Sequence, residues 1–147
     1  MQGNDRGFRP VVGRLAPFIA AAVITWVTVV VGEAVDWPLY VLAAGLAVGS
    51  GALAAAATLV ALRRPEGWAA RFGGTLASLA FLGAVALLRQ SAGGGGSGAA
   101  VVSVIPVFYT ALHSRARHQL YVVLAGMAAF YFAPILLIGP PAYPHSQ

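Results

Sequence analysis

Five long runs without a charged side chain divide this sequence, and the charged residues gather between them. The runs cover residues 15–32, 37–62, 72–88, 90–114 and 118–147. A helix needs about 20 predominantly apolar residues, and at least about 17, to cross the hydrocarbon core of a bilayer. A charged side chain at the centre of such a helix costs about 2.5 to 3.5 kcal/mol. The pattern therefore predicts an all-α, integral membrane helical bundle with about five transmembrane helices.

Proline, glycine and arginine residues set the ends of these helices. The predicted transmembrane domain covers residues 15–139, with helices at residues 15–32, 38–62, 72–88, 99–112 and 119–138. Arg71 and Arg89 bound the third helix, and we expect their long side chains to extend outward to the interface. The first run is too long for the 7 to 15 residue apolar region of a signal peptide, so we interpret it as a span.

The arginines fall almost entirely in alternate loops of this five-helix scheme. Eight of them would lie on one side: Arg6, Arg9, Arg14, Arg63, Arg64, Arg71, Arg115 and Arg117. Basic residues in short loops stay cytoplasmic, so these arginines determine the predicted topology. Residues 1–14 are then a cytoplasmic basic tail, and residues 140–147 are a short extracytoplasmic tail. Arg89 would lie on the outer side with Glu33 and Asp36.

Composition supports a membrane protein and excludes several other classes. Only 9% of the 147 residues are charged, against about 25% in soluble domains, and 59% are hydrophobic. The net charge is +5, but the arginines form small groups instead of the basic stripe that nucleic acid requires, so no nucleic-acid partner is expected. The chain has no cysteine, which excludes disulfides and thiolate chemistry. The lipid bilayer is the expected partner.

No residue cluster in the sequence predicts catalysis, a cofactor or a metal. His113 and His118 lack the further ligands that a metal site needs, and an interfacial loop explains them. Glycines 93–96 are not followed by the lysine of a phosphate-binding loop, so a flexible connector is the better interpretation. Ser97 and Ser103 have no partner in sequence that would act as a base. We therefore expect a non-catalytic protein.

Small residues and prolines suggest where helices pack and bend. Gly45 and Gly49 form a Gly-x-x-x-Gly pair that lets two helix backbones approach closely. The partner is either another helix of this chain or a second copy in a homodimer. Pro106 and Pro134 lie within predicted helices and are candidate hinges, because proline removes a helix hydrogen bond.

One part of the sequence resembles a known family. The segments Ile105 to Leu112, Arg115 to Leu120 and Ala133 to Pro144 together resemble the membrane input region of bacterial diguanylate cyclases (GGDEF proteins) and of related sensor kinases. In that family a Trp-Arg pair, a sixth helix and an output domain follow, and this sequence has none of them. The resemblance therefore implies a sensory or anchoring module, either excised, truncated or paired with a separate signalling output protein. It implies no cyclase activity.

The expected function is thus that of a multi-pass input module of a bacterial signalling protein in the plasma membrane. The alternative is a small membrane transporter or channel subunit. Charged residues inside spans usually mark transport pathways, and none is expected inside the predicted spans. That expectation favours the sensory module.

Overall fold

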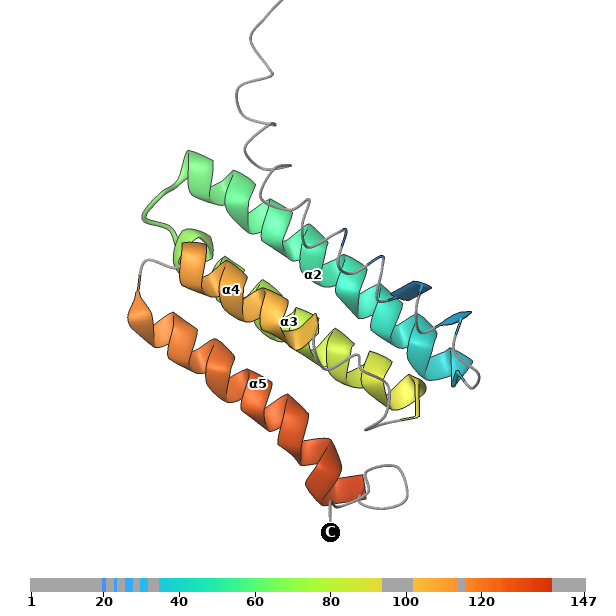
Figure 1. Cartoon of the computed structure of the whole chain (residues 1–147). Coiled ribbons are helices and arrows are strands. Elements are labelled where there is room, and N and C mark those ends of the chain that lie inside the picture. The colour runs from blue at the N-terminus through green and yellow to red at the C-terminus, as the bar shows by residue number, and fades with distance from the viewer. Residues whose placement is uncertain are drawn as a thin grey trace, which may run out of the picture.

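The protein is all-helical over the part of the chain that the structure describes. The computed structural model describes residues 35–93, 102–113 and 116–138, and residues 20, 23, 26, 27, 30 and 31 of the first apolar run. Four labelled helices run through these ranges (Figure 1): α2 (Trp37–Arg63), α3 (Trp68–Ser91), α4 (Val104–His113) and α5 (Arg117–Ile138). The six described residues of the first run are also helical. No strand occurs among the described residues, as the hydropathy pattern predicts.

Three helices are long and apolar enough to span a membrane: α2, α3 and residues Arg117–Leu137 of α5. The predicted boundaries 38–62 and 119–138 agree with α2 and α5 to within two residues. The third span is longer than the predicted 72–88 and includes both flanking arginines, Arg71 and Arg89. Helices of this length and composition indicate a membrane protein.

The structure does not confirm the other two predicted spans, residues 15–32 and 99–112. Most of residues 15–32 lie outside the described residues, as do the two predicted tails, 1–14 and 140–147. In place of the predicted helix 99–112, the structure has α4, which is ten residues long. At a rise of about 1.5 Å per residue, α4 is roughly 15 Å long, about half the thickness of the hydrocarbon core.

Local sequence explains where α2 begins and ends. The Asp36 carboxylate accepts a hydrogen bond from the backbone N–H of Leu39, at 3.4 Å, and so caps the first turn. Pro38 stands in that turn, where its missing N–H has no helical partner to lose. The helix ends at Arg63, because Pro65 disfavours a helical conformation for Arg64. Asp36, a candidate outer-loop charge in the sequence, is therefore a helix cap.

Helix α3 is the centre of the bundle. It contacts α2, α4 and α5, and its most extensive contact is with α2. The two helices approach closely at Gly73, where an added Cβ would collide with the Cβ of Ala57. Ala77 and Ala84 are also buried and lie on the same helical face as Gly73, four and eleven residues further on. Small side chains thus permit close packing of α2 against α3.

The ends of the helices are also joined. The side-chain amide of Gln119, at the start of α5, donates a hydrogen bond to the carbonyl oxygen of Arg71, in the first turn of α3. The first turns of these two helices therefore lie together, at the end of the bundle where α2 finishes (Figure 1).

The outer surface of the bundle is strongly apolar. Only 17% of the most apolar window of α2 and 6% of that of α5 is buried within the protein. Exposed side chains include Val41, Leu59, Leu136 and Leu137, the last with 84% of its surface accessible. A surface of this kind is unfavourable in water and favourable in lipid, which is consistent with the spans.

Candidate functional site

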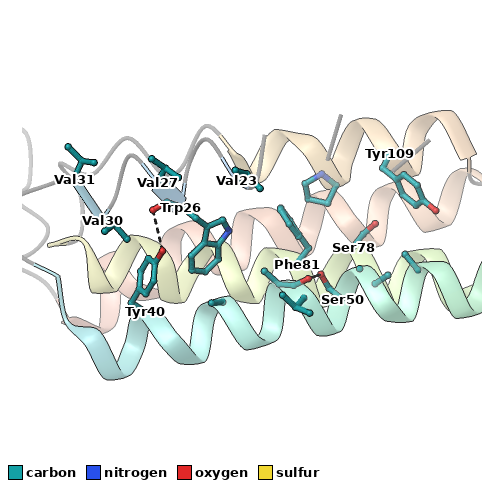
Figure 2. A pocket seen from close by; sticks show the side chains of 17 residues that line it. Val23, Trp26, Val27, Val30, Val31, Tyr40, Ser50, Ser78, Phe81 and Tyr109 are labelled. Atoms are coloured by element: carbon teal, nitrogen blue, oxygen red, sulfur yellow. Dashed lines mark hydrogen bonds between the residues drawn. The ribbon is translucent and has the colours of Figure 1, made fainter. Parts of the chain in front are cut away.

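An apolar cavity of about 650 Å³ lies between the first apolar run, α2, α3 and α4. This volume falls within the range of roughly 300 to 1,000 Å³ that small-molecule sites usually have. Valines and Trp26 of the first run form one wall (Figure 2). Small residues of α2 form the opposite wall, and Ala77, Ser78 and Phe81 of α3 and Pro106 and Tyr109 of α4 complete it.

The cavity is elongated along the helices. Its lining on α2 extends from Tyr40 to Ala54, which is roughly 21 Å at 1.5 Å per residue. Figure 2 shows Tyr40 and Val31 toward one end, Trp26 and Phe81 further along, and Tyr109 toward the other end. The cavity is therefore long enough for a chain-like molecule.

Hydrogen bonds within the protein satisfy three hydroxyl groups of the wall. The Tyr40 hydroxyl donates to the carbonyl oxygen of Trp26, at 3.3 Å. The Ser50 hydroxyl donates to the carbonyl oxygen of Ala47, at 2.7 Å. The hydroxyls of Ser78 and Thr110 lie 3.0 Å apart and share a hydrogen bond. These groups have their partners within the protein, which leaves a mainly hydrocarbon surface toward the cavity.

Aromatic rings form one end of the cavity. The Trp26 and Tyr40 rings pack edge to face with their centres 5.1 Å apart, and the Trp37 ring packs on the same tyrosine at 5.6 Å. Edge-to-face pairs of this kind contribute about 0.5 to 1.5 kcal/mol beyond their burial. The Trp26–Tyr40 pair and the hydrogen bond from Tyr40 to Trp26 together attach the first run to α2.

Ser78 and Thr110 attach α4 to α3 beside the cavity. Both side chains are at least nine-tenths buried, and their shared hydrogen bond joins two helices inside an apolar bundle. Tyr109, the residue next to Thr110, lines the cavity, as does Ser78 itself. The position of α4, and with it the shape of the cavity, therefore depends on this polar pair.

Arg89 is a buried polar residue that does not line the cavity, and its side chain does not lie where the sequence predicts. The residue is inside α3 and only 5% exposed, instead of extending outward from the end of the span. Its Nη1 donates to the carbonyl oxygen of Tyr131 on α5, and its guanidinium lies over the Tyr131 ring. The expectation that the Arg89 side chain extends outward to the interface was wrong, because α3 continues to Ser91 and this side chain turns toward α5.

The described arginines of the predicted topology set lie together at one end of the bundle. Arg63 and Arg64 end α2, Arg71 lies in the first turn of α3, and Arg117 begins α5; all four are exposed. Arg89 is in the last turn of α3, at the opposite end. The remaining members of the set lie outside the described residues: Arg6, Arg9, Arg14 and Arg115.

Gly45 and Gly49 do not contribute to the described packing within this chain. Both are exposed, and a Cβ added to either would meet no described atom within 4 Å. The close approach of α2 and α3 occurs instead at Gly73, on the face of α2 that carries Ala57. The sequence left two partners open for this glycine pair, another helix of this chain or a second copy. Among the described helices of this chain, none packs against either glycine.

The candidate hinges occupy different positions in their helices. Pro106 is buried, lines the cavity and lies in the first turn of α4, where a proline removes no helix hydrogen bond. The reason for expecting a bend there therefore does not hold. Pro134 lies inside α5, where the carbonyl oxygen of Phe130 loses its usual helical donor.

Other candidate residues have structural roles or remain outside the structure's description. Gly93 has a φ of +85° just after α3, a conformation that terminates helices and favours glycine. Residues 94–100 and Glu33 are not described, and for His113 only the backbone is. Among the described residues, no three His, Cys, Asp or Glu side chains come together as metal ligands would.

Sequence reasoning missed that Thr75 and Arg89 are buried on the same face of α3 as Ser78. Thr75, Ser78 and Arg89 are each at least nine-tenths buried. Their spacing of three and then eleven residues places them on one face of the helix, which is the signal that could have identified them.

Comparisons with protein-family models, with curated proteins and with solved structures find no match for this chain.

Proposed function

We propose that this protein is a membrane-embedded, non-catalytic input module that senses a ligand or a change in the bilayer for a signalling output protein. The observation that carries the proposal is the apolar cavity between the first apolar run, α2, α3 and α4. Support also comes from the likeness of residues 105–112, 115–120 and 133–144 to the input region of diguanylate cyclases and sensor kinases. We further propose that the module lies in the bacterial plasma membrane with its amino terminus in the cytoplasm.

The cavity offers a physical route from a stimulus to a helix movement. Occupancy shifts a conformational equilibrium only if the ligand binds two arrangements with different affinity. Helix α4 contributes Pro106 and Tyr109 to the cavity and is joined to α3 by the Ser78–Thr110 hydrogen bond. A displacement of α4 relative to α2 would change the cavity directly, so a ligand there would favour one position of α4.

Spin-label distances test this mechanism. The chain has no cysteine, so labels can be introduced at chosen positions without removing native residues. The pair Leu42→Cys on α2 and Phe108→Cys on α4 uses two exposed sites that do not line the cavity. In nanodiscs we expect two distance populations, with a ratio that changes with lipid composition.

The control pair is Leu42→Cys with Leu76→Cys, which labels exposed positions of α2 and of α3. These two helices pack closely, so their distance should be single and independent of lipid composition. One fixed distance for the α2 and α4 pair under all lipid compositions would contradict the proposed mechanism.

Arg89 favours a second candidate, a small transporter or channel subunit. Ionisable residues inside membrane proteins commonly mark solute or proton pathways, and Arg89 is buried within a spanning helix. The cavity beside it has a volume of only about 20 Å³. Solute or proton flux in proteoliposomes that is abolished by Arg89→Gln, and retained in Arg71→Gln, would support this candidate over the input module.

A further inference from the structure

We infer that the cavity between the first apolar run, α2, α3 and α4 binds a single hydrocarbon chain of a membrane lipid. This inference deepens the proposed function, since it names the class of molecule that the same site would recognise. The occupant follows from the chemistry, the shape and the surroundings of the cavity.

The chemistry of the described part of the wall favours an apolar occupant. The hydroxyls of Tyr40, Ser50 and Ser78 all have hydrogen-bond partners within the protein. Most other lining side chains are alanine, valine and aromatic rings. Apolar cavities do not retain water and take up apolar molecules instead. A hydrocarbon occupant leaves every described hydrogen bond of the wall intact.

The shape fits one extended chain. The lining of α2 extends over roughly 21 Å, measured from Tyr40 to Ala54 at 1.5 Å per residue. One leaflet contributes about half of a hydrocarbon core that is roughly 30 Å thick, so the lining is long enough for a chain that extends through one leaflet. The cavity runs along helices that span the membrane, so a lipid chain can enter it without leaving its usual direction in the bilayer.

The cavity also reaches the outer surface of the bundle. Val31 on the first run and Val48 on α2 both line it, yet they are 80% and 74% exposed. The cavity is thus open sideways, between two apolar segments that face lipid. A chain from the surrounding leaflet can enter there without passing through water.

Quenching of Trp26 fluorescence by a brominated chain tests the inference. Of the three tryptophans, only Trp26 lines the cavity, and the exposed Trp37 and Trp68 can be replaced by phenylalanine. The probe is dibromostearate, titrated into this single-tryptophan protein in maltoside detergent. We expect quenching that saturates near one chain per protein, because bromine atoms in the cavity would lie beside the Trp26 indole.

Two glycines of α2 provide a matched pair of variants. Gly51 lines the cavity and Gly49 does not, although both are exposed and neither has a described atom within 4 Å of an added Cβ. Gly51→Leu should fill the space and weaken binding of the brominated chain by about tenfold or more. Gly49→Leu should bind it as the unsubstituted protein does.

A second pair keeps the test valid if Gly51→Leu fails to fold. Ala47 lines the cavity, and Ala52 is exposed on the outside of the same helix. The variant Ala47→Leu therefore tests the cavity, and Ala52→Leu is its control. Circular dichroism and gel filtration establish which variants are folded. Among folded variants, only Gly51→Leu and Ala47→Leu should lose saturable quenching and the stearate adduct seen by native mass spectrometry.

Three results would overturn the inference. The first is quenching that rises without saturation and is equal in Gly49→Leu and Gly51→Leu, which means that the probe contacts only the outer surface. The second is the absence of both quenching and adduct. The third is efficient disulfide formation between copies carrying Val48→Cys, since a second copy would then cover the cavity. Saturable binding without a lipid-dependent helix movement would contradict the sensory function and leave this inference standing.

Discussion

The guanidinium carbon of Arg89 lies 4.5 Å from the centre of the Tyr131 ring, and Nη1 of the same arginine donates a 3.3 Å hydrogen bond to the carbonyl oxygen of Tyr131. One residue of α5 thus receives both a cation–π contact and a hydrogen bond from α3. Arg89 also lies in the last turn of α3, where the partial negative charge of the helix end favours a cation. These contacts offset part of the cost of burying a charge within the bundle.

Arg89→Gln should lower the free energy of unfolding by about 2 kcal/mol, since it removes the cation–π contact and a charged hydrogen bond. The measurement is unfolding in mixed detergent micelles, followed by circular dichroism. Arg71→Gln is the control, because Arg71 is exposed and should change stability by less than about 0.5 kcal/mol.

Tyr131→Leu separates the two contacts, because the backbone carbonyl remains and only the ring is lost. In a double-mutant cycle with Arg89→Gln, the coupling energy should be about 0.5 to 1 kcal/mol. A coupling near zero would show that the ring does not stabilise the guanidinium.

Ser78→Ala and Thr110→Ala should each destabilise the bundle, and the double variant should lose less than the sum of the two. The two hydroxyls share one buried hydrogen bond between α3 and α4, and such bonds in membrane proteins average about 0.6 kcal/mol. Thermal unfolding of the four proteins in detergent measures the coupling. Strictly additive losses would argue against this hydrogen bond.

Gly73→Leu should destabilise the protein by about 1 to 3 kcal/mol, because its side chain would enter the space held by Ala57 of α2. The same change at Gly45, where an added Cβ meets no described atom within 4 Å, should leave the stability of the single chain almost unchanged. Chemical unfolding under conditions that keep the protein monomeric gives both values. Equal losses at the two positions would contradict the observed packing of α2 on α3.

The exposed glycine pair of α2 gives a separate prediction about a homodimer. If two copies associate through Gly45 and Gly49, leucine at both positions should lower energy transfer between labelled copies in liposomes. Gly51→Leu, at an exposed glycine on a different face of α2, is the comparison. Unchanged energy transfer in the glycine variant would exclude this route to a dimer.

The distribution of arginines predicts the orientation of the bundle. The end that carries Arg63, Arg64, Arg71 and Arg117 should face the cytoplasm, since short basic loops are retained there. A fluorescent protein inserted at Glu66, in the exposed turn between α2 and α3, should fluoresce. Alkaline phosphatase inserted after Gly93 should be active. The reverse pattern would overturn the proposed orientation.

Hydropathy along the chain was sufficient for the helical class and for the ends of α2 and α5. In lipid, backbone groups must bond within their own segment, so a long uncharged run has helix as its favoured solution. Asp36, Pro38 and Pro65 then mark the ends of α2 by local chemistry alone, which depends on neighbours in sequence. These features are local, and a single sequence contains them.

Only the tertiary structure decided which way the polar residues of α3 face and which small residues pack. A charge near the end of an apolar run can extend outward or turn inward, and the choice for Arg89 depends on Tyr131, 42 residues away. Gly45 and Gly73 are equally small, yet only Gly73 lies opposite Ala57. The cavity, likewise, exists because residues from four segments meet around a space that none of them fills. Such contacts join residues far apart in the chain, and hydropathy, which averages over all faces of a helix, carries no information about them.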